Sequence, residues 1–326
     1  MSLPYTLRLL CLCGASFFMI HLALALAMRL SAGTAERFAE RLKPSAGARL
    51  LFAVRMLPLT LTLFAILAFC IPSYLWLEPD ATGEKVGFLC CFMAVLGAAI
   101  WTTSLVRVVH AVRGTTRYLH SCERHGKRIN VPGETAPALL LKDASPVLAV
   151  AGVVNPRLVI SRRVVRGLTR EQIEAALSHE RAHRTAGDNL KRFLILLAPD
   201  ILPFLRGFKK LERSWAKVTE WAADDHATAG DSRRALSLAD ALVRVAKMGN
   251  KPQLSYLSSS LMADDHDLEE RVDRLLRPQP APEKPAKALI PFVSATAGLM
   301  LASLAVVAAW PASLSVVHRA LEQLIH

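Results

Sequence analysis

The chain has 326 residues, of which 52% are hydrophobic, 21% charged and only 6% aromatic. This aliphatic surplus over the roughly 45–50% of a soluble domain argues against an ordinary soluble enzyme, and it excludes a chain that is disordered throughout. The formal net charge of +13 indicates an anionic partner, and for so apolar a chain we expect lipid headgroups rather than nucleic acid.

Four stretches are long and apolar enough to cross the hydrocarbon core of a bilayer, which takes about 20 residues. They predict membrane spans at 7–28, 50–76, 86–110 and 288–310. A fifth apolar run, 193–208, is broken by two prolines and an aspartate and is short for a span. We expect that run to pack on a domain or to dip into the membrane interface.

The placement of Lys and Arg predicts the orientation, because positively charged short loops stay in the cytoplasm. The loop between the first two spans carries five Lys or Arg, whereas the next loop carries one lysine against three acidic residues. Six more basic residues lie between positions 107 and 128. The segment 111–287 is therefore predicted to be cytoplasmic, with both termini outside, in a multi-pass protein of a bacterial-type inner membrane.

The predicted fold class is mainly α, a polytopic helical membrane protein with four spans and a cytoplasmic α+β domain. Its parts are 1–110 for the first three spans, 111–277 for the cytoplasmic domain, 278–287 for a proline-rich linker, 288–310 for the fourth span and 311–326 for a short outer tail.

Local signals predict the elements of the cytoplasmic domain. Residues 147–152 and 157–161 are typical of two short strands around a turn at Asn155-Pro156. Thr169 and Gln172 form a capping box that starts a helix at Arg170. Further helices are expected at 209–229, 232–248 and 265–277.

The capped helix carries the pattern His-Glu-x-x-His at residues 179–183. Spacing by four places His179 and His183 on one helix face, so one zinc ion can contact both imidazoles. Glu180 lies about 100° round the helix, where its carboxylate can take a proton from a metal-bound water without binding the metal.

A catalytic zinc needs a third protein ligand, for which Glu220 is the leading candidate. It lies on a predicted helix, and Asp224 follows one turn later on the same face, where it can hydrogen-bond a ligand histidine. The alternative is that both residues belong to a solvated acidic face, and the preceding histidine motif favours the metal site.

These residues resemble the integral-membrane zinc metallopeptidases of the BlaR/MecR type, which are gluzincins. The resemblance covers most of the chain and includes three spans before a cytoplasmic domain and one after it, the approach 168–173 into the motif, Asp188 after the second histidine, and a late helix at 268–276. These relatives carry an extracellular penicillin-binding domain that has no counterpart here, so the resemblance does not imply beta-lactam sensing.

The resemblance implies a mini-gluzincin domain of mostly helices with a small sheet. It implies that His179, His183 and Glu220 bind one Zn²⁺, that Glu180 is the general base and that Asp224 supports a ligand. HtpX and CAAX-type membrane proteases share this motif, but the HtpX pattern places two spans between the motif and the third ligand. A third alternative is a signalling scaffold that zinc only braces, although such a site has no use for a base at Glu180.

Peptide hydrolysis also needs a donor for the oxyanion, and residue type alone leaves several candidates. We expect Asp188 to orient the motif helix or a ligand. The possible donors are His226, Arg271, Arg233 and His266.

The expected partner is a protein or peptide substrate, and a transcriptional repressor is one possibility. One of the strands 147–152 and 157–161 could be an exposed edge to which a substrate adds, or both could pack inside a small sheet. No nucleic-acid partner is expected, because the basic stretch 107–128 contains one aromatic residue, Tyr118, for stacking.

Overall fold

The computed structural model describes residues 4–77, 86–132, 136–142, 146–200, 207–249, 257–260 and 268–277, with a few residues between 314 and 321. The predicted fourth span 288–310, the proline-rich linker 278–287 and His266 lie outside these residues.

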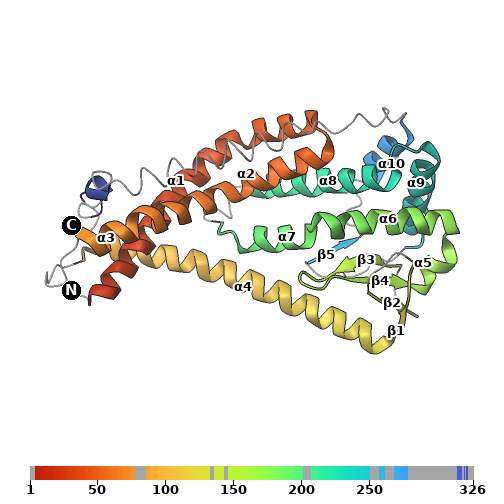
Figure 1. The fold of residues 1–326 in the computed structure, drawn as a ribbon, viewed down its shortest axis with the longest axis horizontal. Helices are drawn as coiled ribbons and strands as arrows, with labels where there is room; N and C mark the ends of the chain where they lie inside the picture. Colours follow the sequence, from red (N-terminus) through yellow and green to blue (C-terminus); the bar gives the residue numbers. More distant parts are fainter. Residues whose placement is uncertain are drawn as a thin grey trace.

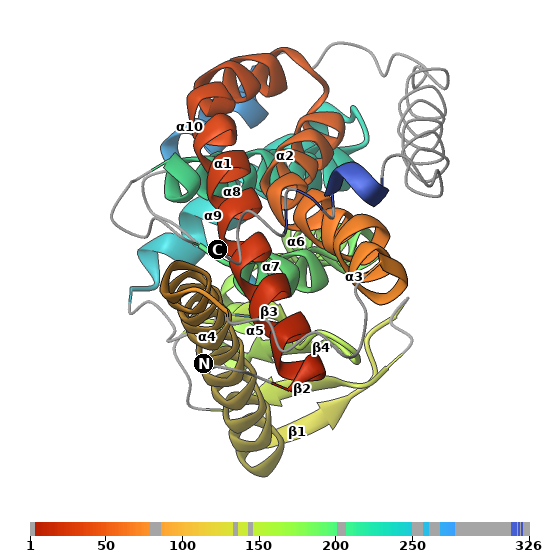
Figure 2. The same cartoon turned by 90° about the vertical axis from the view of Figure 1, so that its left-hand side faces the viewer.

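Among the described residues, three helical segments are long and apolar enough to cross a membrane. They are α1 (Tyr5–Arg41), the continuous run of α2 (Pro44–Ala65), the π-helical η1 (Ile66–Cys70) and α3 (Ile71–Leu77), and α4 (Phe88–His125). The chain is therefore a membrane protein, and the first three predicted spans are confirmed as helices. Figure 1 shows α1 and α2 as a hairpin beside α4, and Figure 2 shows the three segments from the end that holds both termini.

Small residues let α1 and α4 pack closely. A side chain at Gly97 would place its Cβ atom 2.6 Å from the carbonyl oxygen of Gly14, so the two backbones nearly touch there. Such approaches at glycine are typical of helix pairs in membranes, where van der Waals packing drives association.

Helix α4 does not end at the predicted membrane boundary but continues through residues 111–125 and leads directly into a sheet. The strands are β1 (Gly126–Ile129), β2 (Ala138–Leu141), β3 (Leu148–Ala151), β4 (Arg157–Ser161) and β5 (Ser258–Ser260), in the order β1-β2-β4-β3-β5. Strands β2 and β4 pair in parallel and the other pairs are antiparallel.

The two predicted strands around Asn155-Pro156 are confirmed as β3 and β4, and of the two alternatives left open for them the exposed edge is excluded. Strand β4 lies between β2 and β3, and β3 lies between β4 and β5. The alternative, packing within a small sheet, is correct, since every residue of β3 is buried.

Both faces of the sheet are covered by helices, as Figure 1 shows. On one face Leu139, Ala149 and Val159 pack against Leu119 and Tyr118 near the end of α4. On the other face Ala138, Leu148, Val150, Leu158 and Ile160 form the main core with α6, α9 and α10. The helices that follow the sheet are α5 (Arg162–Gly167), α6 (Arg170–Ala186), α7 (Asp188–Leu197), α8 (Gly207–Thr228), α9 (Ser232–Lys247) and α10 (Leu268–Leu276), which confirms the four predicted ones.

Candidate metal centre

Residues at each end of the motif helix define where it begins and where it stops. At the start of α6 the Thr169 side chain accepts from the backbone N–H of Gln172, and the Gln172 side chain accepts from the N–H of Thr169, as the capping box predicts. At the end Gly187 adopts a left-handed conformation with φ of 69°, which suits glycine. Helix α7 begins at the next residue, so the turn returns Asp188 toward the motif.

The three predicted ligands converge at one buried point. The Nε2 atoms of His179 and His183 are 3.1 Å apart, and they lie 3.4 and 3.5 Å from the two carboxylate oxygens of Glu220. All three side chains are buried, and their ligand atoms lie within 4.8 Å of one another. Two nitrogens bound tetrahedrally to zinc at about 2.0–2.1 Å would be roughly 3.3 Å apart, so the group fits such an ion.

The chemistry of the donor atoms also fits a metal ion. Neither carboxylate oxygen of Glu220 forms a hydrogen bond within the described part of the chain, although the side chain is buried. Arg271 lies 3.1 Å from one carboxylate oxygen, and a cation between the carboxylate and the two imidazoles would satisfy the other oxygen and both Nε2 atoms. His179, His183 and Glu220 would then be the ligands.

Each imidazole is oriented by a second carboxylate. His179 Nδ1 lies 2.9 Å from Asp224 Oδ1, and His183 Nδ1 lies 2.8 Å from Asp188 Oδ2. These contacts turn the Nδ1 atom of each imidazole to a carboxylate and its Nε2 atom toward Glu220, where the lone pair of Nε2 can bind a metal. Lys191, which the sequence analysis missed, lies 2.9 Å from the other oxygen of Asp188. Burial raises the pKa of Asp188, but His183 and Lys191 together hold it below its ordinary value.

Arg271 links the acidic groups of the centre. Its guanidinium donates two hydrogen bonds of 2.7 and 2.9 Å to Asp224 and lies 3.1 Å from Glu220. Burial raises the pKa of both carboxyls, but the opposing charges prevail: they lower the pKa of Asp224 to about 2 and that of Glu220 well below its usual range. Arg271 thus pairs with the ligand Glu220 and with Asp224, which supports His179, and its predicted role as an oxyanion donor stays a prediction.

Glu180 is buried beside the ligands, but its environment differs from that of Glu220 and Asp224. No hydrogen bond from another side chain in the described residues reaches its carboxylate. Burial raises its pKa from an ordinary value of 4.5 to about 7, although His179 and His183 act in the opposite direction. A carboxyl that titrates near neutral pH can both accept and donate a proton, which is what a general acid–base group requires.

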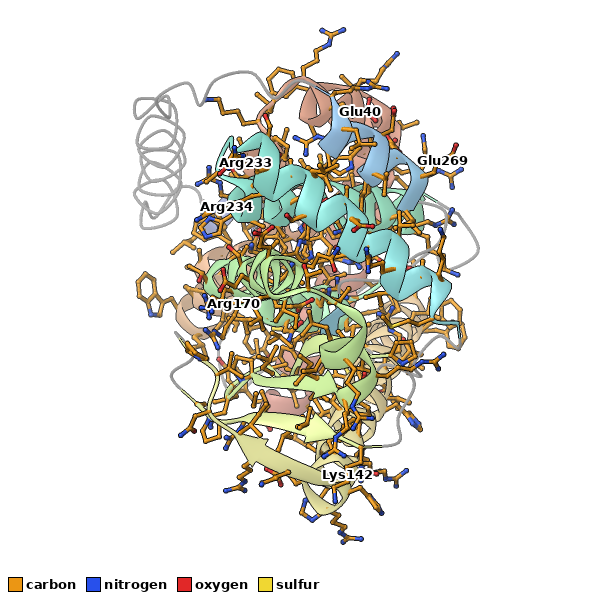
Figure 3. The ribbon with its side chains drawn as sticks, turned by 90° about the vertical axis from the view of Figure 1, so that its right-hand side faces the viewer. Glu40, Lys142, Arg170, Arg233, Arg234 and Glu269 are labelled. Carbon is orange, nitrogen blue, oxygen red and sulfur yellow. The ribbon has the colours of Figure 1, made fainter. Side chains whose placement is uncertain are left out.

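The remaining predicted residues lie away from the ligand group. His226 is exposed on α8 and lines a cavity of about 450 Å³ with Asp188 and Lys191. Arg233 lies on α9 at the outer end of the domain, near Arg234 (Figure 3).

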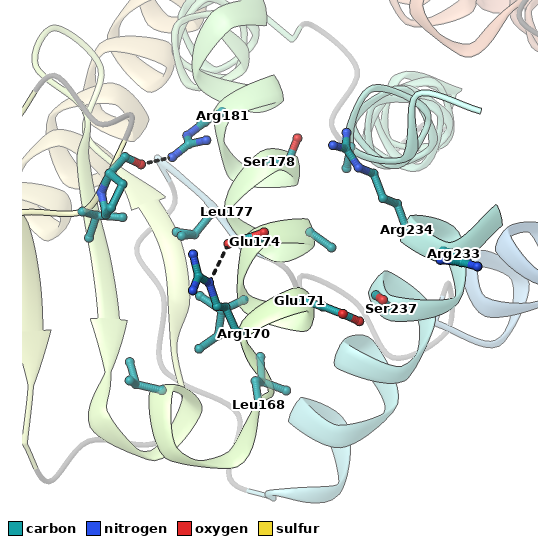
Figure 4. Close-up of a pocket in the computed structure, with 16 residues that line it drawn as sticks. Leu168, Arg170, Glu171, Glu174, Leu177, Ser178, Arg181, Arg233, Arg234 and Ser237 are labelled. Carbon is teal, nitrogen blue, oxygen red and sulfur yellow. Dashed lines mark hydrogen bonds and ion pairs between the residues drawn. The ribbon is translucent and has the colours of Figure 1, made fainter. Parts of the chain in front are cut away.

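A larger cavity, of about 940 Å³, lies between α6 and α9. Figure 4 shows Arg170 paired with Glu174 in its wall and Arg181 bonded to the carbonyl of Pro132. None of the three predicted metal ligands lines this cavity, so it is separate from the centre.

Taken with the membrane helices, the buried histidine and glutamate group defines a membrane metallopeptidase. A family model described as BlaR1 peptidase M56 matches residues 84–275, from just before α4 to the end of α10. The chain belongs to this family of proteases, which confirms the resemblance seen in the sequence. No curated protein matches the chain.

Proposed function

We propose that this protein is a zinc-dependent endopeptidase of the inner membrane that cleaves a protein substrate on the cytoplasmic side. The observation that carries the proposal is the convergence of His179, His183 and Glu220 with Glu180 buried beside them. Three ligands leave a fourth position of a tetrahedral zinc open for water, whereas a structural zinc takes four protein ligands.

Bound zinc would supply Lewis-acid polarisation of the scissile carbonyl and a water molecule of lowered pKa. Glu180 would accept the proton of that water and pass it to the nitrogen of the leaving amine. Asp224 and Asp188 orient the imidazoles so that each Nε2 atom faces the metal position, and Arg271 balances the negative charge of Asp224 and Glu220.

An extended substrate would bind by adding a strand to the sheet. Helix α6, which carries Glu180, packs on β3, and in the described structure β5 covers the edge of β3. A substrate would therefore pair with the outer edge of β5.

The proposed biological role is regulatory, with the cleavage of a cytosolic repressor or of a membrane protein as the signal. Membership of the BlaR1 family supports this role over the quality-control role of HtpX and CAAX-type proteases. The alternative of a non-catalytic scaffold braced by zinc would leave Glu180 without a purpose.

The experiment compares membrane and cytosolic fragments in cells that carry wild type, Glu180→Gln or Glu174→Gln. Glu174 is the matched control, because it lies on the same helix but is exposed and paired with Arg170. We expect Glu180→Gln to retain zinc and to lose the fragments, and Glu174→Gln to behave as wild type. If Glu180→Gln leaves every fragment in place, the protein is not a protease that works through this residue.

A further inference from the structure

The three described membrane segments each direct one buried or partly buried polar side chain to the same short stretch of backbone. Arg55 of α2 and Arg107 of α4 donate to the carbonyl oxygen of Ala198 at 3.4 and 3.3 Å. His21 of α1 lies with its Nε2 atom 3.2 Å from the carbonyl oxygen of Pro199. Side chains from residues 21, 55 and 107 thus meet at two consecutive peptide groups.

The backbone at this point is the end of α7. Ala198 is the residue that closes the helix, and Pro199 follows it. The last carbonyl groups of a helix have no partners within it and carry partial negative charge, so arginines are favourable ligands for them. The other end of the same helix is Asp188, which orients His183.

Arg55 also holds the beginning of α8. Its Nε atom donates to Glu212 at 2.7 Å, and its guanidinium lies 4.7 Å from the centre of the Phe208 ring. The arginine side chain is 2% exposed, so this ion pair is largely shielded from water on the arginine side. Glu220 follows Glu212 by eight residues on the same helix, which is about 12 Å along its axis.

Apolar side chains extend the contact between α2 and α8 toward the metal centre. Trp215 and Val218 of α8 lie in one buried cluster with Ala48 and Leu51 of α2. A single rigid helix therefore contacts a membrane segment along one part of its length and supplies Glu220 along the other.

We propose that Arg55 is a positioning residue for the metal centre. By holding the end of α7 and the start of α8 against the membrane helices, it sets where Asp188 and Glu220 stand relative to the two ligand histidines. The inference rests on the proposed zinc peptidase, and it makes metal affinity depend on how the membrane helices are arranged. Removing the guanidinium takes away its bond to Glu212, its bond to the Ala198 carbonyl and its contact with the Phe208 ring, so the end of α7 and the start of α8 lose their tie to α2.

The test uses the full-length protein in detergent, with zinc affinity measured by competition with a chelator and cleavage measured as kcat and KM. Arg55→Met is the main variant, and Arg49→Met is its matched control, because Arg49 is exposed on the same helix and donates to the backbone of Ser45. Arg55→Lys, Glu212→Gln and the double variant Arg55→Met with Glu212→Gln complete the series.

We expect Arg55→Met to weaken zinc binding about tenfold and to lower kcat with KM unchanged, because supports of metal ligands are typically worth about 10–100-fold. Arg55→Lys should fall between Arg55→Met and wild type. The double variant should lose less than the two single changes combined, and Arg49→Met should match wild type.

Wild-type zinc affinity in a folded Arg55→Met protein would overturn the proposal. If that variant does not fold, Arg55→Lys decides, and a folded Arg55→Lys protein with wild-type affinity and kcat overturns it equally. The proposed function can fail separately: if Glu180→Gln cleaves as wild type while zinc affinity still depends on Arg55, the positioning role stands and peptidase chemistry through Glu180 does not.

Discussion

Replacing Glu180 by glutamine should stabilise the metal-free protein while it abolishes cleavage. Burial raises the pKa of Glu180 from 4.5 to about 7. A rise of that size means that the folded protein disfavours the charged carboxylate by about 3 kcal/mol. Glutamine has nearly the shape of the protonated acid and never carries the charge, so Glu180→Gln should remove this cost.

The pH dependence of the gain follows from the direction of the shift. A carboxyl whose pKa is higher in the folded state destabilises the protein fully when the pH is above the folded-state pKa. It has no effect when the pH is below the unfolded-state pKa. The stability difference between Glu180→Gln and wild type should therefore be near zero at pH 4.5, grow between pH 4.5 and about 7, and level off near 3 kcal/mol at higher pH.

The assay is equilibrium unfolding of the metal-free protein in detergent at a series of pH values. Tryptophan fluorescence reports on the centre, because Trp215 and Trp221 lie on α8 near Glu220. Glu174→Gln, on the exposed face of the same helix, should give no pH-dependent gain. A Glu180→Gln protein that is no more stable than wild type at pH 8 would refute the reasoning that burial sets the pKa of this group.

Three further outcomes are expected. About one zinc per chain should copurify, and metal analysis should show that a double change of His179 and His183 to alanine removes it; unchanged zinc in that variant would contradict the ligand assignment. Asp224→Ala should weaken zinc binding about 10–100-fold in a chelator titration, and a change below about twofold would deny it a supporting role. Alkaline phosphatase fused near Asp80 should be active and fused at Arg128 inactive, and the reverse pattern would invert the predicted topology.

The membrane helices and the metal ligands are predictable because their signals are local. An apolar run of about 20 residues is read directly from composition, and two histidines four apart on a capped helix must share a face. Glu220 is less directly predictable. The sequence predicts the helix that carries it, but not that this helix packs against the helix of the two histidines. The structure brings that helix to α6, where Glu220 completes the group.

The parts that sequence reasoning missed depend on pairing between distant segments. Strands β1, β2 and β5 have only three or four residues each, too short for an alternating pattern, and β5 is three serines, which do not favour a strand. Arg271 lies 47 positions from Asp224, so nothing local could identify its partner. Whether β3 or β4 is an edge stayed open for the same reason, because β5 joins β3 from over a hundred residues later.

Arg55 shows why the membrane helices are more than an anchor for the domain. It lies inside the predicted second span, where a charged side chain is costly unless another part of the protein pairs with it. Its partner Glu212 belongs to the helix that carries Glu220. Docking of α8 on α2 therefore brings the opposite charge that offsets the burial of Arg55. Gly47 permits that docking, since a side chain there would place its Cβ atom 3.2 Å from Val218 and 2.7 Å from the carbonyl oxygen of Ala39. These contacts join the membrane helices to the metal centre, and we expect a rearrangement of the first to reach the second through α7 and α8.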